Sequence, residues 1–271
     1  MQKYFILFLK GMAMGIANVI PGVSGGTIAL ITEIYEELIN SLKSLNKKAL
    51  ELLFSFKIKE FLHYTNFYFL TAVFAGSIIS VFTIAILFEY LFSNYPILIW
   101  AFFFGLILAS IIFVGKRVEN WDLHSTIAII VGTAIAVSLN FITPTTENSN
   151  LLFVFVCGII GISGMMLPGL SGSYILILLG NYELLMVKAV TDLNITLLGT
   201  FILGSIFGLV SFSHLLSWIL KEHRDSTLAL LTGFILGSLN IIWPWKEAAK
   251  SLDLNGQIKI IAMKNAPSSS S

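Results

Sequence analysis

The sequence predicts an all-α polytopic membrane protein built from two inverted-topology repeats. Of its 271 residues, 56% are hydrophobic and only 11% are charged, whereas a soluble domain carries about 25% charged residues. The chain also contains the motif Pro-Gly-x-Ser-Gly twice, at 21–25 and at 168–172. The low charge indicates a chain surrounded by lipid, and the second copy of the motif indicates an internal duplication.

The chain is expected to divide into two repeats and a tail. Residues 1–145 contain a broken helix at 4–38, an amphipathic connection at 40–66 and three spans. Residues 151–245 contain a broken helix at 151–187 and two spans, and residues 246–271 form the tail. Five segments are apolar over the roughly 20 residues that a span needs: 67–92, 97–115, 124–142, 195–220 and 227–245.

Each of the two remaining apolar stretches is interrupted by a Pro-Gly pair, at Pro21-Gly22 and at Pro168-Gly169. Proline removes a backbone donor and clashes with the preceding turn, and glycine tolerates unusual dihedral angles. Both stretches are therefore expected to form two half-helices, either as a re-entrant hairpin or as one broken span. Broken backbone at membrane depth is tolerated only against protein or a water-filled cavity.

Positive charges orient the expected spans. The connection at 40–66 mixes lysines with Leu and Phe, which predicts an amphipathic helix on the inner leaflet, and we place it in the cytoplasm. The turns that contain Lys116-Arg117 and Lys221 fall on the same side. The segment 143–150 carries no positive charge and is expected outside.

The two halves match each other along much of their length. At an offset of 147 residues the matches are Gly11 with Gly158, Pro21 with Pro168, Ser24 with Ser171, Tyr35 with Tyr182 and Glu36 with Glu183. At an offset of 128, "AGSIIS" at 75–80 matches "LGSIFG" at 203–208. Three spans between the two motifs would make the second copy enter from the opposite face, as in many secondary transporters. The alternative is an old duplication kept for packing.

A small hydroxyl and glycine cluster follows each break. The clusters are Ser24-Gly25-Gly26-Thr27 and Ser171-Gly172-Ser173-Tyr174, each at the expected start of a half-helix. Unpaired amide groups and the helix dipole favour an anion there. The hydroxyls would otherwise simply cap their own helices. Asn18 lies one turn before the first break and Met165 stands in its place in the second half, so any site is only quasi-symmetric.

Two matched carboxylates, Glu36 and Glu183, are expected at the far ends of the second half-helices, near opposite membrane faces. Both are read first as solvated acids at helix ends. A proton-coupling role is the alternative, since intramembrane acids are costly and often functional.

Several chemistries find no support in the sequence. There is no Walker A loop, no cluster of histidine, cysteine and acids at metal-ligand spacing, and no Ser-His-Asp set. We therefore expect no catalytic residues, no metal and no cofactor. The net charge of +1 gives no reason to expect a nucleic-acid partner.

The motif regions "GMAMGIANVIPGVSGGTIALITEIYEEL" and "GIIGISGMMLPGLSGSYILILLGNYELL" resemble the bacterial polyprenyl-phosphate transporter family, long known as a membrane domain of unknown function. The resemblance covers nearly the whole chain. It implies a multi-pass protein of the bacterial inner membrane that returns undecaprenyl phosphate to the inner leaflet, with membrane lipids and polyprenyl phosphate as partners. In the family a glycine often stands before the Tyr-Glu of the first motif, as Gly180 does in the second, but this chain has Glu33 there.

Carried over by position, the resemblance implies substrate-binding residues in both halves: Asn18, Pro21, Gly22, Ser24, Gly25, Gly26, Thr27, Pro168, Gly169, Ser171, Gly172, Ser173 and Tyr174. A phosphate ester needs anion-binding backbone inside a bilayer, and its isoprenoid tail can stay in lipid while the head group crosses. Three alternatives remain: a transporter or channel for a small soluble anion, a membrane enzyme acting on lipid phosphates, and a structural membrane protein.

Overall fold

The computed structural model describes residues 2–19, 23–244, 246–252 and 258–265. Pro21 and Gly22 of the first motif therefore lie outside the described residues. In the first half the helices are α1 (Gln2–Val19), α2 (Gly25–Ile31), α3 (Tyr35–Lys43), α4 (Lys47–Phe54), α5 (Ile58–Tyr64), α6 (Phe67–Asn94), α7 (Pro96–Gly115) and α8 (Leu123–Ser138), followed by a 3₁₀ turn at Leu139–Phe141. In the second half they are α9 (Leu151–Met166), α10 (Gly172–Leu178), a π-helical turn at Leu184–Lys188, α11 (Ala189–Thr191), α12 (Ile195–Glu222) and α13 (Arg224–Ser238).

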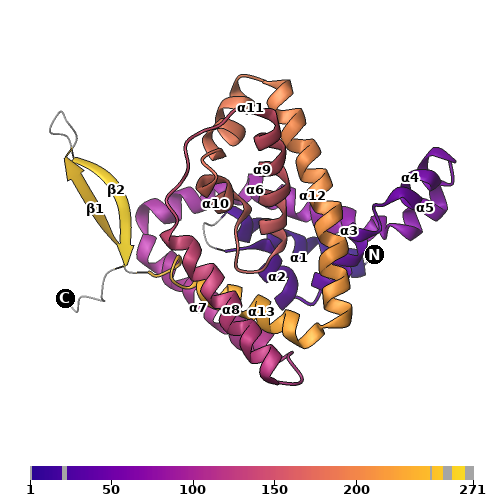
Figure 1. Ribbon diagram of the computed structural model, residues 1–271, viewed down its shortest axis with the longest axis horizontal. Helices are drawn as coiled ribbons and strands as arrows, with labels where there is room; N and C mark the ends of the chain where they lie inside the picture. Colours follow the sequence, from indigo (N-terminus) through magenta and orange to yellow (C-terminus); the bar gives the residue numbers. More distant parts are fainter. Residues whose placement is uncertain (1, 20–22, 245, 253–257, 266–271) are drawn as a thin grey trace.

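The structure is that of a helical membrane protein (Figure 1). Among the described residues, three helical segments are long and apolar enough to cross a bilayer: Ile97–Gly115, Leu123–Phe141 and Ile195–Glu222. The pair Ile58–Tyr64 and Phe67–Thr83, bent by 66°, would be a fourth. These segments agree with four of the five spans that the sequence predicts.

The fifth predicted span, at 227–245, is not among these segments. Helix α13 has 15 residues and ends at Ser238, so at 1.5 Å per residue it is about 22 Å long, short of the roughly 30 Å of hydrocarbon. Most of its side chains are buried, because it packs against α7 and α8. The apolar character of this segment therefore reflects burial within the protein.

Both predicted broken helices are broken, and each contains a second interruption. Helix α1 ends at Val19 and α2 begins at Gly25, and α9 ends at Met166 and α10 begins at Gly172. The second breaks follow at Glu33 (φ 64°) and Gly180 (φ 72°), which share the left-handed backbone conformation. Glycine adopts that conformation freely, whereas a residue with a Cβ pays a steric cost. The second half-helix expected up to residue 38 is therefore two helices, α2 and α3.

The connection at 40–66 forms a helical hairpin, so the single amphipathic helix expected there is wrong. Helices α4 and α5 meet at Phe56, whose φ of 56° ends the helical path. The hairpin extends away from the other helices (Figure 1), and Phe54 and Phe56 at its tip are 77% and 87% exposed. Its lysines and exposed aromatic residues fit the amphipathic character that the sequence indicates.

The tail, to which the sequence assigns no element, contains two strands. Strand β1 (Lys246–Leu252) pairs antiparallel with β2 (Ile258–Asn265), with a bulge between Ala249 and Lys250. The low-complexity end at 266–271 lies outside the described residues.

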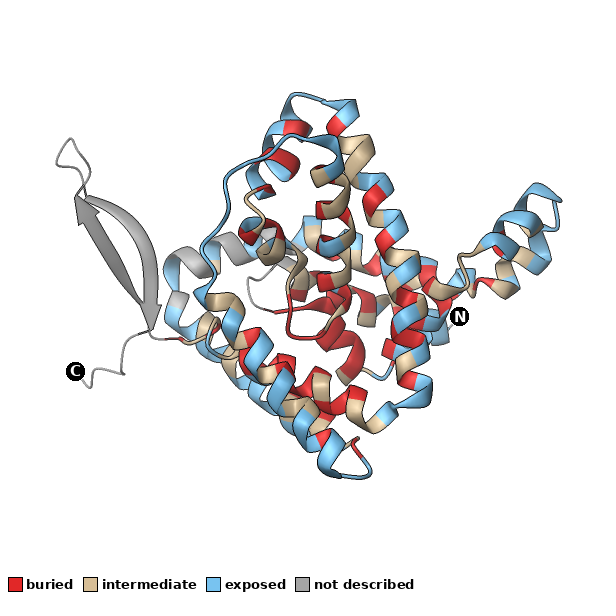
Figure 2. Cartoon of the chain, in the orientation of Figure 1, coloured by how far each residue is buried: buried red, intermediate tan, exposed pale blue. Residues whose placement is uncertain are grey.

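Buried residues concentrate on α2, near the middle of the molecule, and along α13 (Figure 2). The residues of α2 from Gly25 to Leu30 are all buried. By contrast, α7, α8 and α12 present large apolar side chains outward, including Phe102 (63% exposed) and Ile130 (62%). Lipid would cover such an outward face, whereas α2 is enclosed by protein.

Glycines allow two pairs of helices to cross at close range. Helix α1 packs on α6, and α9 packs on α12. A Cβ on Gly76 would lie 2.1 Å from the carbonyl oxygen of Phe8, and a Cβ on Gly204 would lie 2.1 Å from that of Phe155. Small residues at membrane helix interfaces permit such backbone contact.

We expect Gly76→Ala and Gly204→Ala each to lower the free energy of unfolding by about 1–3 kcal/mol, because the added methyl group forces the helices apart. Gly105→Ala and Gly199→Ala are matched controls, since, apart from the adjoining residues and backbone of the same helix, no described residue lies within 4 Å of a Cβ at either position. These controls should be neutral or slightly stabilising, because alanine is the better helix former. Unfolding of the purified protein in detergent measures all four, and equal losses at all four positions would contradict the close crossing.

Candidate functional site

Residues that follow the first break contact the second break directly. The hydroxyl of Ser24 donates to the carbonyl of Leu167 at 3.2 Å, and the amide of Gly169 donates to Thr27 Oγ1 at 2.9 Å. The buried hydroxyl of Tyr35 donates to the carbonyl of Met166 at 3.0 Å. Polar groups of the first half thus satisfy the backbone that the second break leaves unpaired, as buried polar groups require.

The backbone amides of the first motif are bonded within the protein, and we call this motif closed. The amide of Gly25 donates to Asn18 Oδ1 at 2.8 Å, and the amide of Gly26 donates to Ser24 Oγ at 3.1 Å. Ser24 and Thr27 are 1% and 0% exposed. The amides that the sequence offers to an anion therefore already have internal partners here, and Ser24 is the N-cap of α2.

The second motif is accessible and lacks a side-chain cap, and we call it open. Ser171 Oγ lies 2.8 Å from Ser173 Oγ, and neither serine is buried. Among the described residues, no side chain caps α10. The residue matched to Asn18 is Met165, whose thioether is only a weak acceptor. Tyr174 turns away, because its hydroxyl donates to the carbonyl of Leu139 at 3.1 Å.

The remaining predicted residues hold the break itself. Pro168 lies against the first motif, since a Cβ on Gly26 would be 3.3 Å from its nitrogen. Gly169 has a φ of 80°, and a Cβ there would lie 2.5 Å from the carbonyl carbon of Phe234 in α13. Glycine is thus required at this position on two grounds.

A cavity of about 290 Å³ lies beside the open second motif, and we call it the second-half cavity. Its polar lining residues are Asn18, Ser171, Ser173, Tyr182 and Ser205. Tyr182 and Ser205 are not among the site residues predicted from the sequence. Both stand at positions that match between the halves, opposite Tyr35 and Ser77, and that signal could have identified them.

A second cavity, of about 340 Å³, lies beside the closed first motif, and we call it the first-half cavity. Its walls are mostly apolar and come from α1, α3 and α6, with Asn18, Tyr35 and Ser77 as the polar side chains. Asn18, Ile162 and Met165 line both cavities. The two spaces therefore adjoin.

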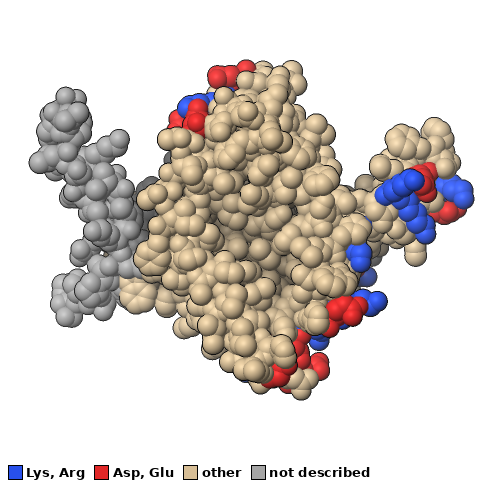
Figure 3. Space-filling model, in the orientation of Figure 1, with Lys and Arg blue, Asp and Glu red and all other residues tan. Residues whose placement is uncertain are grey.

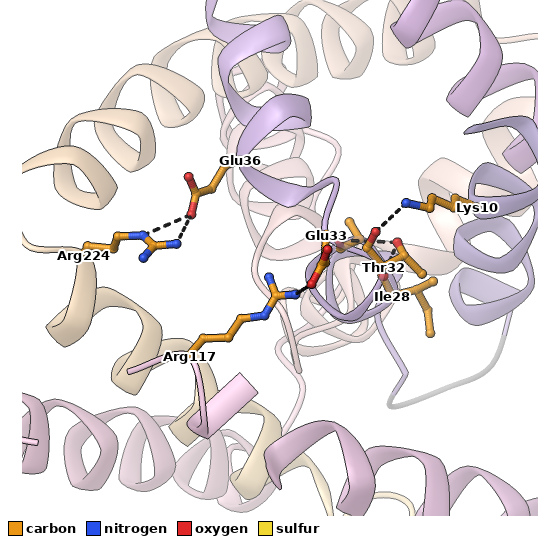
Figure 4. A network of polar contacts seen from close by, with 8 residues as sticks. Lys10, Ile28, Thr32, Glu33, Glu36, Arg117 and Arg224 are labelled. Atoms are coloured by element: carbon orange, nitrogen blue, oxygen red, sulfur yellow. Dashed lines mark hydrogen bonds and ion pairs between the residues drawn. The ribbon is translucent and has the colours of Figure 1, made fainter. Parts of the chain in front are cut away.

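On the face shown in Figure 3, charged residues lie at the periphery, including the projecting hairpin, and none appears across the middle. At one end Glu33 pairs with Arg117, and Arg224 pairs with Glu36 at 3.1 Å (Figure 4). Lys10 Nζ also donates to the carbonyl of Thr32 there, at 2.7 Å. An uncharged middle between charged ends is the pattern expected of a protein that spans a bilayer.

The opposite end carries its own ion pairs. Lys188 lies 2.8 Å from Glu147 and 3.5 Å from Glu183. The hydrogen bond with Glu147 raises the pKa of Lys188, so the lysine is charged at neutral pH. Glu36 and Glu183 thus have cationic neighbours and stay half or more exposed.

The side chains of the site can bind and release a ligand, and they suggest no covalent chemistry. Among the described residues no group of three or more metal-ligating side chains occurs. Serine hydroxyls bind an anionic head group well, and apolar walls suit hydrocarbon. One cavity lined by hydroxyls beside one lined by apolar side chains suits an amphiphilic substrate, and the class that this arrangement indicates is a membrane transport protein.

Comparison with known proteins gives the family. Residues 14–259 match the VCA0040-like family, described as undecaprenyl phosphate translocase-like, and this chain belongs to that family. A polyprenyl-phosphate transporter of Vibrio cholerae is 41% identical over 91% of this chain and 80% of the relative. One of Staphylococcus aureus is 31% identical over 90% of this chain and 88% of the relative. No solved structure matches the chain.

Proposed function

We propose that this chain moves polyprenyl phosphate, such as undecaprenyl phosphate, across the bacterial cytoplasmic membrane for reuse as a carrier lipid. The observation that carries the proposal is the open, hydroxyl-lined second-half cavity in a chain of this family. Ser171, Ser173 and Asn18 would hold the phosphate, which otherwise crosses the bilayer at a cost of many kcal/mol. The family is one of transporters and not of enzymes.

The proposal includes two repeated halves with opposite directions in the membrane. The crossings of α1 with α6 and of α9 with α12 support the repeat, because Phe8 and Phe155 differ by 147 and Gly76 and Gly204 by 128, the two offsets of the sequence match. The ends of α2 and α10 lie near opposite ends of α8, which supports opposite directions of the two halves in the membrane. Glu33, after α2, pairs with Arg117 before α8, whereas the carbonyl of Leu178 in α10 accepts from the amide of Thr145 after α8.

The two cavities support an exchange of roles between the halves. Matched positions line both of them: Gly25 and Gly172, Gly26 and Ser173, Tyr35 and Tyr182, Ile39 and Met186, Val73 and Phe201, Ser77 and Ser205. One motif is closed and the other is open in the same structure. Alternating access would follow if the first motif opens as the second closes, so that the site faces each leaflet in turn.

The predicted residues then have distinct roles. Asn18, Ser171, Gly172 and Ser173 would contact the phosphate in the present state. Ser24, Gly25, Gly26 and Thr27 would do so after the exchange, once the bonds of Ser24 to Leu167 and of Gly25 to Asn18 have broken. Pro168 and Gly169 would hold the break open, and Tyr174 would anchor α10.

We propose that Glu36 and Glu183 form ion pairs with Arg224 and Lys188 at the two ends of the molecule, and that neither carries protons during transport. We expect Glu36→Gln and Glu183→Gln to keep transport within about threefold, because exposed ion pairs contribute roughly 0–1 kcal/mol. The pH dependence of transport should also be unchanged. Loss of that dependence in either variant would assign proton coupling to the substituted carboxylate.

Transport of a small soluble anion is the main rival. It needs a continuous polar path, and the mostly apolar first-half cavity speaks against one. Proteoliposomes with entrapped labelled phosphate and, separately, labelled undecaprenyl phosphate decide between the two. We expect protein-dependent movement of the lipid and no release of the entrapped phosphate, whereas release of the phosphate alone would favour the rival.

A further inference from the structure

The first-half cavity has a chemistry that a phosphate does not need. Gly25 and Gly26 in its wall use their amides on Asn18 and Ser24. The hydroxyl of Tyr35 is used on the carbonyl of Met166. Apart from Asn18 and Ser77, the rest of the lining is aliphatic, aromatic or methionine, and it includes Leu38, Ile39, Phe74, Ile78, Phe82 and Leu209. Such a surface favours hydrocarbon over a charged group.

This cavity adjoins the proposed phosphate site on one side and the lipid on the other. Asn18, Ile162 and Met165 line both this cavity and the second-half cavity, so the two spaces adjoin at these side chains. Phe74, Ile78 and Phe82 of α6 also line it, and their 44%, 56% and 75% exposure shows that protein does not fully cover the cavity at this helix. A chain lying in the cavity could therefore continue between these side chains into the bilayer.

We infer that the first-half cavity binds the isoprene units next to the phosphate, while the phosphate itself lies in the second-half cavity. This inference rests on the proposed function, since it assigns the two parts of one lipid to the two cavities. Asn18 and Met165 mark the junction between head group and chain. The more distant isoprene units stay in lipid, and the protein selects for a hydrocarbon next to the phosphate.

Filling the cavity tests the inference. Ser77→Phe places a ring in the first-half cavity from α6, and Leu209→Trp does so from α12. Ile79→Phe is the matched control, because Ile79 is 46% exposed on α6 and does not line the cavity. Binding of farnesyl phosphate and of hexyl phosphate to each purified protein is measured by native mass spectrometry. The two ligands share a phosphate and differ in their chain.

We expect the unsubstituted protein and Ile79→Phe to bind farnesyl phosphate at least about tenfold more tightly than hexyl phosphate, because more apolar area is buried. Ser77→Phe and Leu209→Trp should remove most of this difference, because they weaken binding of farnesyl phosphate more than binding of hexyl phosphate. An unchanged difference in either folded variant would overturn the inference while leaving the proposed function intact. Failure of the unsubstituted protein to bind either phosphate would count against the proposed function itself.

Discussion

Asn18→Asp is expected to abolish translocation of polyprenyl phosphate while the protein stays folded. The new carboxylate keeps the oxygen that accepts from the amide of Gly25, so the start of α2 remains capped. It also places a negative charge in the wall of both cavities. Two like charges 4 Å apart repel by about 4 kcal/mol at an effective dielectric constant near 20, which corresponds to a roughly thousandfold loss of binding.

The control for this variant is Asn194→Asp. Asn194 caps α12 through the amide of Leu197 at 3.1 Å and lies outside both cavities. It undergoes the same change of side chain, and transport should be unaffected. Translocation rates and unfolding temperatures of both variants are compared with those of the unsubstituted protein. Normal transport by Asn18→Asp would exclude Asn18 from the phosphate site.

Alanine at both Ser171 and Ser173 should lower translocation roughly a hundredfold or more. Hydrogen bonds to a charged group contribute about 1.5–3 kcal/mol each, and two are lost. Stability should change little, because the two hydroxyls bond to each other and are not buried. Thr71→Ala on α6 is a suitable control, since its exposed hydroxyl donates only to the carbonyl of Phe67 among the described residues.

The corresponding substitution in the first half should behave differently. Ser24→Ala removes the cap of Gly26 and the bond to Leu167, so it should lower stability as well as transport. Loss of a buried N-cap costs about 0.5–2 kcal/mol. If Ser24→Ala and the Ser171/Ser173 double variant had the same effects on stability and transport, the distinction between a closed and an open motif would be wrong.

Much of this fold follows from local signals in the sequence. The Pro-Gly pairs predict the breaks, and the start of α10 at Gly172 agrees with the position of the second motif. Four predicted spans correspond to long apolar helical segments. Glu33 was notable as a substitution for a family glycine, and it adopts the left-handed backbone that Gly180 adopts in the other half.

The features that could not be predicted from the sequence depend on contacts between distant segments. Helix α13 reads as a span because burial against α7 and α8 selects the same apolar residues as lipid does. The amide of Gly25 has a partner only because the rotamer of Asn18 brings its side-chain oxygen within reach. The hydrogen bond from Tyr35 to the carbonyl of Met166 joins residues 131 positions apart. The difference between the two cavities follows from these contacts.

The central claim is that the hydroxyl-lined second-half cavity carries the lipid phosphate across the membrane. Purified protein in liposomes, with labelled undecaprenyl phosphate placed in one leaflet, tests it most directly. We expect rapid protein-dependent transfer to the other leaflet, and transfer near the protein-free rate for the Ser171/Ser173 double alanine variant. Equal rates for that variant and the unsubstituted protein, or no transfer by either, would contradict the account.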